Sequence, residues 1–98
     1  MAVAEISVVP VGTGSASISN YVADAVRIVK ASGLKYELSS MGTNVEGDVP
    51  AILEIVKKVH EACFKAGAVR VLTTVKIDDR RDKTLSIEGK KAAVTAKV

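Results

Sequence analysis

The stretch that decides the fold is residues 34–48, which read LKYELSSMGTNVEGD. Apolar and polar side chains alternate over residues 34–39, which is the period of a β-strand with one buried face. A short turn with a glycine follows, and residues 43–46 form a second extended segment. Two short strands separated by a few turn residues predict a β-hairpin in the middle of the chain.

The second strand of this hairpin ends in a pattern that favours a binding site. Glu46 lies between Gly42 and Gly47, and glycine lets a backbone approach a ligand closely. An isolated glutamate on a short strand faces either water or a ligand, and both alternatives stay open here. Asp48 is interpreted as the N-cap of the next helix, with Pro50 tolerated in its first turn.

The residues before the hairpin have the pattern of a strand followed by a helix. Residues 3–11 are rich in β-branched side chains, and a glycine-rich loop follows them. Apolar residues then recur at helical spacing over residues 18–29, with Ser17 or Ser19 placed to cap the helix. Gly33 is placed to end this helix in a left-handed conformation.

The same order recurs after the hairpin. Helical spacing predicts a second helix over residues 49–63, Gly67 ends it, and alternation over residues 69–77 predicts a last strand. Two β-α-β units joined by a hairpin predict an α+β protein of the ferredoxin-like βαββαβ class, with two helices on one face of a four-stranded antiparallel sheet. The right-handed crossover rule places the first and third strands side by side in the centre. We expect residues 1–98 to form a single domain, and the weak pattern of residues 85–98 is compatible with a short terminal helix.

The sheet face turned away from the helices determines how the protein associates. In this arrangement it carries both charged and apolar side chains: Glu5, Ser7, Val9, Asn44, Glu46, Arg70, Leu72, Thr74 and Lys76. A half-apolar sheet left bare is an association surface, so we expect it to pack against another subunit, with any pocket at that junction. Lys76 and Glu5, on neighbouring strands, are expected to form a cross-strand ion pair.

The composition excludes several classes of function. The chain has 98 residues with no Trp, one Phe and two Tyr, so it lacks the aromatic platforms on which single-stranded nucleic acids stack. Its net charge of +3 comes with a mixed-sign run near residues 78–91, which is typical of a solvated surface. The first residues show no basic segment followed by a long apolar one, and no run of about 18 apolar residues occurs. We therefore expect a cytoplasmic protein that binds neither nucleic acids nor membranes.

Patterns typical of catalytic and metal sites are missing from the sequence. His60 is the only histidine, and we interpret it as a partly buried or surface side chain rather than a general base. Cys63 is the only cysteine and is interpreted as a small buried apolar residue. The residues offer no Ser-His-acid set and no cluster of metal ligands, and the glycine-rich loop at residues 12–17 lacks the lysine of a P-loop. We predict no enzymatic activity, no metal and no cofactor.

Several segments together resemble the small single-domain thiamine-binding proteins, which are related to two-repeat proteins that bind thiamine and its hydroxymethylpyrimidine moiety. The segments are VPVGT at residues 9–13, SNYV at 19–22, SGLKY at 32–36, MGTNVEGD at 41–48 and KIDDRRDK at 76–83. The resemblance runs over nearly the whole chain, and its most specific parts are Met-Gly-Thr-x-x-Glu-Gly and Asp-x-Arg-x-Asp-Lys.

The resemblance implies a ferredoxin-like, cytoplasmic homo-oligomer, a dimer or a dimer of dimers, that binds thiamine or its hydroxymethylpyrimidine moiety without chemistry. An aminopyrimidine requires a carboxylate or carbonyl beside a hydroxyl or amide donor. Glu46 is the expected acceptor for the amine, and Arg80 suits a phosphate if the bound form is phosphorylated. The remaining candidates supply a donor, a close backbone approach or a ring face: Gly42, Thr43, Asn44, Ser7, Ser19 and Tyr21.

Two other functions are compatible with the same residues. A homo-oligomeric assembly or regulatory module without a small-molecule ligand would use Glu46 only as a paired interface residue. An enzyme would require Glu46 to act as a base with a pKa raised by burial. The three alternatives therefore differ in what the Glu46 carboxylate contacts.

Overall fold

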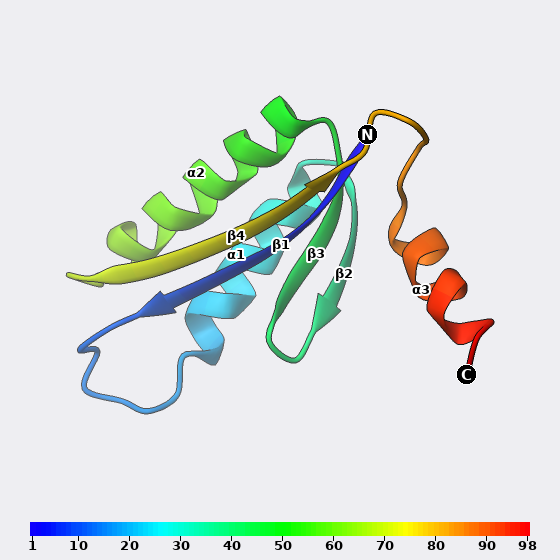
Figure 1. Ribbon diagram of the computed structural model, residues 1–98. Helices are drawn as coiled ribbons and strands as arrows, with labels where there is room; N and C mark the ends of the chain where they lie inside the picture. The colour runs from blue at the N-terminus through cyan, green and yellow to red at the C-terminus, as the bar shows by residue number, and fades with distance from the viewer.

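The computed structural model describes residues 1–98 and contains four strands and three helices (Figure 1). Their order along the chain is β1 (Ala2–Pro10), α1 (Ser19–Ala31), β2 (Lys35–Ser39), β3 (Gly42–Gly47), α2 (Val49–Lys65), β4 (Val71–Asp79) and α3 (Ile87–Thr95). The strands form one antiparallel sheet in the order β2-β3-β1-β4, so β1 and β3 lie side by side at the centre, as predicted. The architecture is the expected ferredoxin-like α+β fold, and the predicted C-terminal helix is present as α3.

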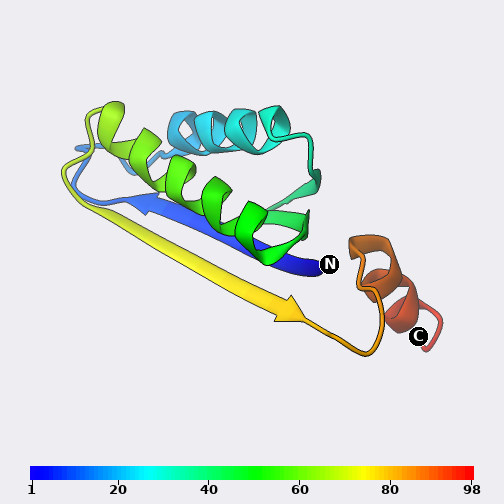
Figure 2. The ribbon, with the colours of Figure 1, turned by 90° about the horizontal axis from the view of Figure 1, so that it is seen from above.

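The helices α1 and α2 cover one face of the sheet (Figure 2). Side chains alternate along a strand, so the even-numbered residues of β1 point toward these helices and are buried. They pack with α1 and with a stripe of α2 whose members are three or four residues apart: Ile52, Ile55, Val59 and Cys63. Cys63 is buried as predicted, and burial raises the pKa of its thiol.

The helices α1 and α2 begin and end close to the predicted residues, but the predicted capping side chains make no capping hydrogen bonds. Gly33 and Gly67 follow α1 and α2 with φ values of +77° and +106°, which confirms both as left-handed terminators. Asp48 is the N-cap of α2, although its side chain makes no capping hydrogen bond. The prediction of a serine cap for α1 was wrong, because Ile18 occupies that position and the Ser17 and Ser19 hydroxyls face each other at 3.3 Å.

The other face of the sheet carries the odd-numbered side chains of β1, as predicted. The pairing of Glu5 with Lys76 is confirmed, with 3.4 Å between Oε1 and Nζ. Arg70, predicted to lie in the last strand, comes just before β4. The strand β4 pairs only with β1, and their last pair is Pro10 with Val71. None of the helices has the length and apolar character needed to span a bilayer.

The C-terminal segment covers one end of this open face. Leu85 and Ile87 are buried against Val3, and α3 continues from there beyond the helix layer (Figure 2). The helix begins at an N-cap, Ser86, whose hydroxyl accepts a hydrogen bond from the Gly89 N–H at 2.9 Å. All residues after Ile87 are exposed, so only the start of α3 packs on the sheet.

Candidate functional site

A pocket forms where the central strand β1 extends beyond the end of its neighbour β3. β3 pairs with β1 from Gly47 opposite Ala2 to Thr43 opposite Ile6, whereas β4 follows β1 as far as Pro10. The part of β1 beyond Ile6 therefore has a free edge on the side of β3, next to the turn of the β2–β3 hairpin. A cavity of about 200 Å³ lies at this edge.

The pocket is apolar and carries no charged side chain. Its walls come from α1, from β1, from the hairpin turn and from one residue of α2: Ile6, Ser7, Val8, Val9, Ile18, Val22, Ala25, Val29, Leu38, Ser39, Ser40, Met41, Gly42, Thr43 and Val59. Taking a charge out of water into such surroundings is costly unless it is paired, so the pocket favours a neutral group. An engineered cavity of about 150 Å³ admits benzene, so this one has room for a single substituted six-membered ring.

The backbone of Val8 supplies a donor and an acceptor to this pocket. The Val11 N–H donates to the Arg70 carbonyl at 2.8 Å, so the odd-numbered residues of β1 direct their backbone polar groups toward β4. Even-numbered residues direct theirs toward β3, which no longer pairs at Val8. The Val8 N–H and C=O therefore face the free edge, where a ligand can satisfy both.

Thr43 adds a hydroxyl to the same wall. It lies opposite Ile6 at the end of β3, its side chain points to the helix face, and the residue is 6% exposed. The hydroxyl makes no hydrogen bond within the protein and borders the cavity. Gly42, beside it, is favoured by space, because a Cβ there would lie 3.0 Å from the Ile6 carbonyl oxygen and from Glu5 Cγ, closer than most Cβ contacts. The glycine thus lets the hairpin turn close against β1.

The structure divides the predicted site residues among several places. Ser7, Gly42 and Thr43 meet at the pocket. Tyr21 packs partly buried against the core and Ser19 is exposed at the start of α1, while their neighbours Ile18 and Val22 line the pocket instead. Figure 1 shows that α1 runs alongside the hairpin and β1, which explains why only one stripe of it reaches the cavity.

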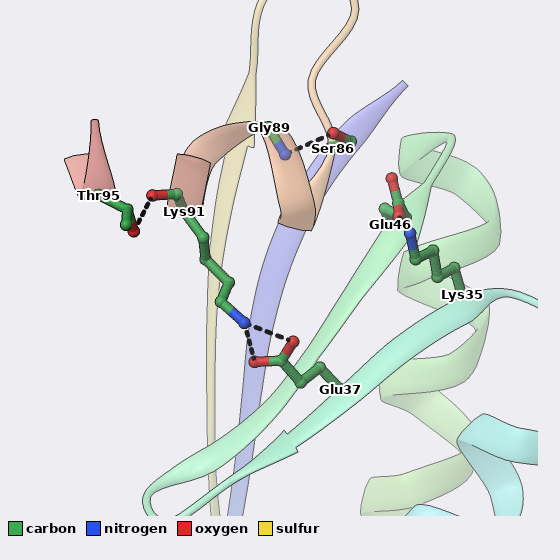
Figure 3. Close-up of polar contacts among 7 residues, drawn as sticks. All are labelled: Lys35, Glu37, Glu46, Ser86, Gly89, Lys91 and Thr95. Atoms are coloured by element: carbon green, nitrogen blue, oxygen red, sulfur yellow. Dashed lines mark hydrogen bonds and ion pairs between the residues drawn. The ribbon is translucent and has the colours of Figure 1, made fainter. Parts of the chain in front are cut away.

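Glu46 and Asn44 lie on the opposite, open face of the sheet. Glu46 is 6% exposed, its Oε1 is 3.6 Å from Lys35 Nζ, and that oxygen has no hydrogen-bond partner. Figure 3 shows this carboxylate beside Lys35. The sheet itself therefore separates Glu46 from Thr43.

The remaining predicted site residue, Arg80, is engaged within the protein, and so is His60, which was not predicted to belong to the site. Arg80 follows β4, and its Nε donates to Asp82 Oδ1 at 2.8 Å. This guanidinium holds the pKa of Asp82 below its ordinary value. His60 is partly buried as predicted, with its Nδ1 2.7 Å from the Thr73 hydroxyl oxygen.

The free edge at Val8 was missed by the sequence analysis, although one signal for it was available. The strand pattern of β1 covers more residues than either strand of the hairpin, so part of β1 must lack a partner on that side. Three apolar side chains that line the pocket, Val9, Leu38 and Met41, are exposed and form an apolar rim, with Met41 at 81%. Exposed apolar side chains gathered in this way mark an interaction surface.

Comparison with known proteins gives a consistent family. The family described as "Thiamine-binding protein" matches residues 4–95. A UPF0045 protein of Methanothermobacter thermautotrophicus is 46% identical over 100% of both chains, and the UPF0045 protein YqgV of Bacillus subtilis is 42% identical over 92% of this chain and 90% of its own.

Solved structures agree with this result. The hypothetical protein MJ1052 of Methanocaldococcus jannaschii is 40% identical, with a TM-score of 0.90 over 96% of this chain and 95% of its own. A Thermotoga maritima protein provisionally assigned to thiamine biosynthesis or salvage is 26% identical, with a TM-score of 0.81 over 95% of this chain and 97% of its own.

Proposed function

The chain belongs to the thiamine-binding protein family, and we propose that it binds thiamine, or the hydroxymethylpyrimidine moiety of thiamine, without transforming it. The observation that carries this proposal is the uncharged, ring-sized pocket onto which the Val8 N–H and C=O open. An aminopyrimidine has an amine donor beside a ring nitrogen acceptor, which complements an adjacent backbone acceptor and donor.

In the proposed complex the pyrimidine ring occupies the pocket. Its amine donates to the Val8 carbonyl and its ring nitrogen accepts from the Val8 N–H, while the Thr43 hydroxyl bonds a further polar atom of the ligand. The cationic thiazolium half and any phosphate stay outside, because the pocket has no group to compensate a charge. Thiamine, its diphosphate and hydroxymethylpyrimidine should therefore bind through the same contacts.

The proposed pocket is completed by a second subunit. The apolar rim of Val9, Leu38 and Met41 is too exposed for a finished ligand site, and a second copy placed there would cover both the rim and the ligand. The proposal includes a cytoplasmic homo-oligomer, a dimer or a tetramer. The alternative, an assembly module without a ligand, rests on the same rim.

Calorimetric titration of the full chain with the three thiamine compounds tests this function. Val22→Phe places a larger side chain in the pocket and should abolish binding, whereas Val26→Phe, the same change elsewhere on α1, should leave it intact. Binding that survives Val22→Phe would move the site elsewhere. Absence of binding by the unmodified protein, together with association in solution, would favour the assembly module.

A further inference from the structure

The open face of the sheet holds the one buried side-chain oxygen or nitrogen of this protein that has no hydrogen-bond partner. It is Oε1 of Glu46, and its nearest cation, Lys35 Nζ, is 3.6 Å away. Buried polar atoms are nearly always paired, because an unpaired one loses its hydration without compensation. The arrangement around Glu46 therefore lacks a donor that a ligand can supply.

Glu46 belongs to a row of side chains that runs straight across the sheet. The strand register places Asp78 of β4 opposite Val3 of β1, and Val3 opposite Glu46 of β3. Neighbouring strands are about 4.8 Å apart, so the backbones of the two acidic residues are about 10 Å apart, with one apolar residue between them. The row has the order carboxylate, apolar group, carboxylate.

The C-terminal segment covers this row with complementary chemistry. Leu85 and Ile87 pack on Val3, and Lys90 forms an ion pair with Asp78. Lys91 of α3 reaches Glu37 of β2, with 3.1 Å between Nζ and Oε2 (Figure 3). The segment therefore presents apolar side chains and ammonium groups to the face, but it brings no donor to Glu46.

Leu85 and Ile87, which are 6% and 4% exposed, hold the segment on the sheet, and its attachment is slight only beyond them. Beyond Ile87 every residue is exposed, and both lysine ion pairs lie at the surface, where such pairs are weak. A cavity of about 290 Å³ already opens beside Lys90, lined by Val3, Glu5, Asn44, Lys76 and Asp78 among others. Glu46 does not line this cavity, but it lies opposite Val3, which does and which Leu85 and Ile87 cover.

We propose that this row is a second binding site, distinct from the pocket at Val8, for a short α,ω-diamine whose two ammonium groups bond Glu46 and Asp78 while its methylenes lie on Val3. The ligand takes the place of Lys90 on Asp78 and supplies the donor that Glu46 lacks. Binding displaces Leu85 and Ile87 from Val3, and with them the start of α3, which covers the unoccupied site.

Titration of the full chain with 1,4-diaminobutane tests this site, with n-butylamine as the matched probe that lacks the second ammonium. We expect saturable binding of the diamine. The Kd for n-butylamine should be higher by a factor of about ten or more, because one charge-assisted hydrogen bond is lost. Glu46→Gln and Asp78→Asn should each weaken the diamine by a similar factor. Glu54→Gln, an exposed glutamate on α2, is the control and should bind as the unmodified protein does.

Hydrogen exchange gives a second readout that general charge attraction would not produce. Saturating diamine should speed exchange of the α3 amides while the amides of β1 and β3 keep their protection. Equal binding of the diamine and the monoamine, unchanged affinity in both Glu46→Gln and Asp78→Asn, or unchanged exchange of α3 would each overturn the proposal. Loss of thiamine binding rather than diamine binding in Glu46→Gln would also overturn it, and would assign Glu46 to the thiamine site.

Discussion

Replacement of Thr43 by valine should raise stability and lower ligand affinity at the same time. Thr43 is a buried residue whose hydroxyl has no partner within the protein and reaches the cavity, so valine keeps the shape and removes a partly desolvated polar group that only cavity water can satisfy. Mutational data give about 1–3 kcal/mol for the cost of burying a hydroxyl without a hydrogen bond. Because this hydroxyl borders a cavity, we use the lower end and expect valine to raise the free energy of unfolding by about 1 kcal/mol. For a domain of this size that corresponds to a Tm increase of about 4–8 °C.

The same change removes one hydrogen bond to the ligand in the proposed complex. A hydrogen bond between neutral groups contributes about 0.5–1.5 kcal/mol, so the Kd for thiamine should rise roughly 2- to 12-fold. Thermal unfolding without ligand measures the first effect, and isothermal titration with thiamine and with hydroxymethylpyrimidine measures the second.

Thr73→Val is the matched control on β4. The Thr73 hydroxyl oxygen is 2.7 Å from His60 Nδ1, so this valine breaks an existing hydrogen bond and should lower stability by about 1 kcal/mol. It lies outside the pocket, so ligand affinity should not change. A Tm lowered by Thr43→Val as by Thr73→Val, or thiamine binding to the Thr43 variant as tight as to the unmodified protein, would contradict the proposed role of the Thr43 hydroxyl.

Two further predictions concern the surface. Light scattering at micromolar concentration should give the mass of at least two chains, and Leu38→Ser with Met41→Ser should shift it toward one, because both side chains belong to the exposed rim; a one-chain mass for the unmodified protein would contradict the proposed interface. The pKa of Asp79 lies below its ordinary value because Arg81 donates hydrogen bonds to its Oδ2 at 3.0 and 2.8 Å. A lowered pKa stabilises the fold above the unfolded-state value, and that contribution is lost as the pH falls through the folded-state value. Arg81→Gln should therefore move the pKa of Asp79 back up in a carboxyl NMR titration, and an unchanged value would show that Arg81 is not the cause.

The strands and helices could be predicted because each depends on local periodicity. Alternation placed Glu5 and Lys76 on the same face, and the structure pairs them. Gly33 and Gly67 ended helices as expected, since a left-handed residue is a local requirement. The cap of α1 was not predictable in this way, because the residue at that position, Ile18, has no side-chain group that can accept a hydrogen bond and instead lines the pocket.

The candidate site was only partly predictable, and one error in it was avoidable. Thr43 and Glu46 are three residues apart on one strand, so they must point to opposite faces of the sheet. Grouping them in one ligand site treated closeness in sequence as closeness in space. The burial of Glu46 could not be inferred locally, because it depends on a C-terminal segment that crosses the open face some forty residues later in the chain.

The ligand pocket exists because the β2–β3 hairpin stops where it does. β3 begins at Gly42, whose missing Cβ lets the turn close against the Ile6 carbonyl. If the hairpin were two residues longer on each strand, β3 would continue opposite Val8, and the ladder would use the donor and acceptor that now face the cavity. The recognition group of this protein is then a stretch of main chain rather than a side chain. For this reason the apolar, uncharged lining of the pocket accounts for a neutral ligand group, whereas the length of the hairpin accounts for the donor and acceptor that this group must match.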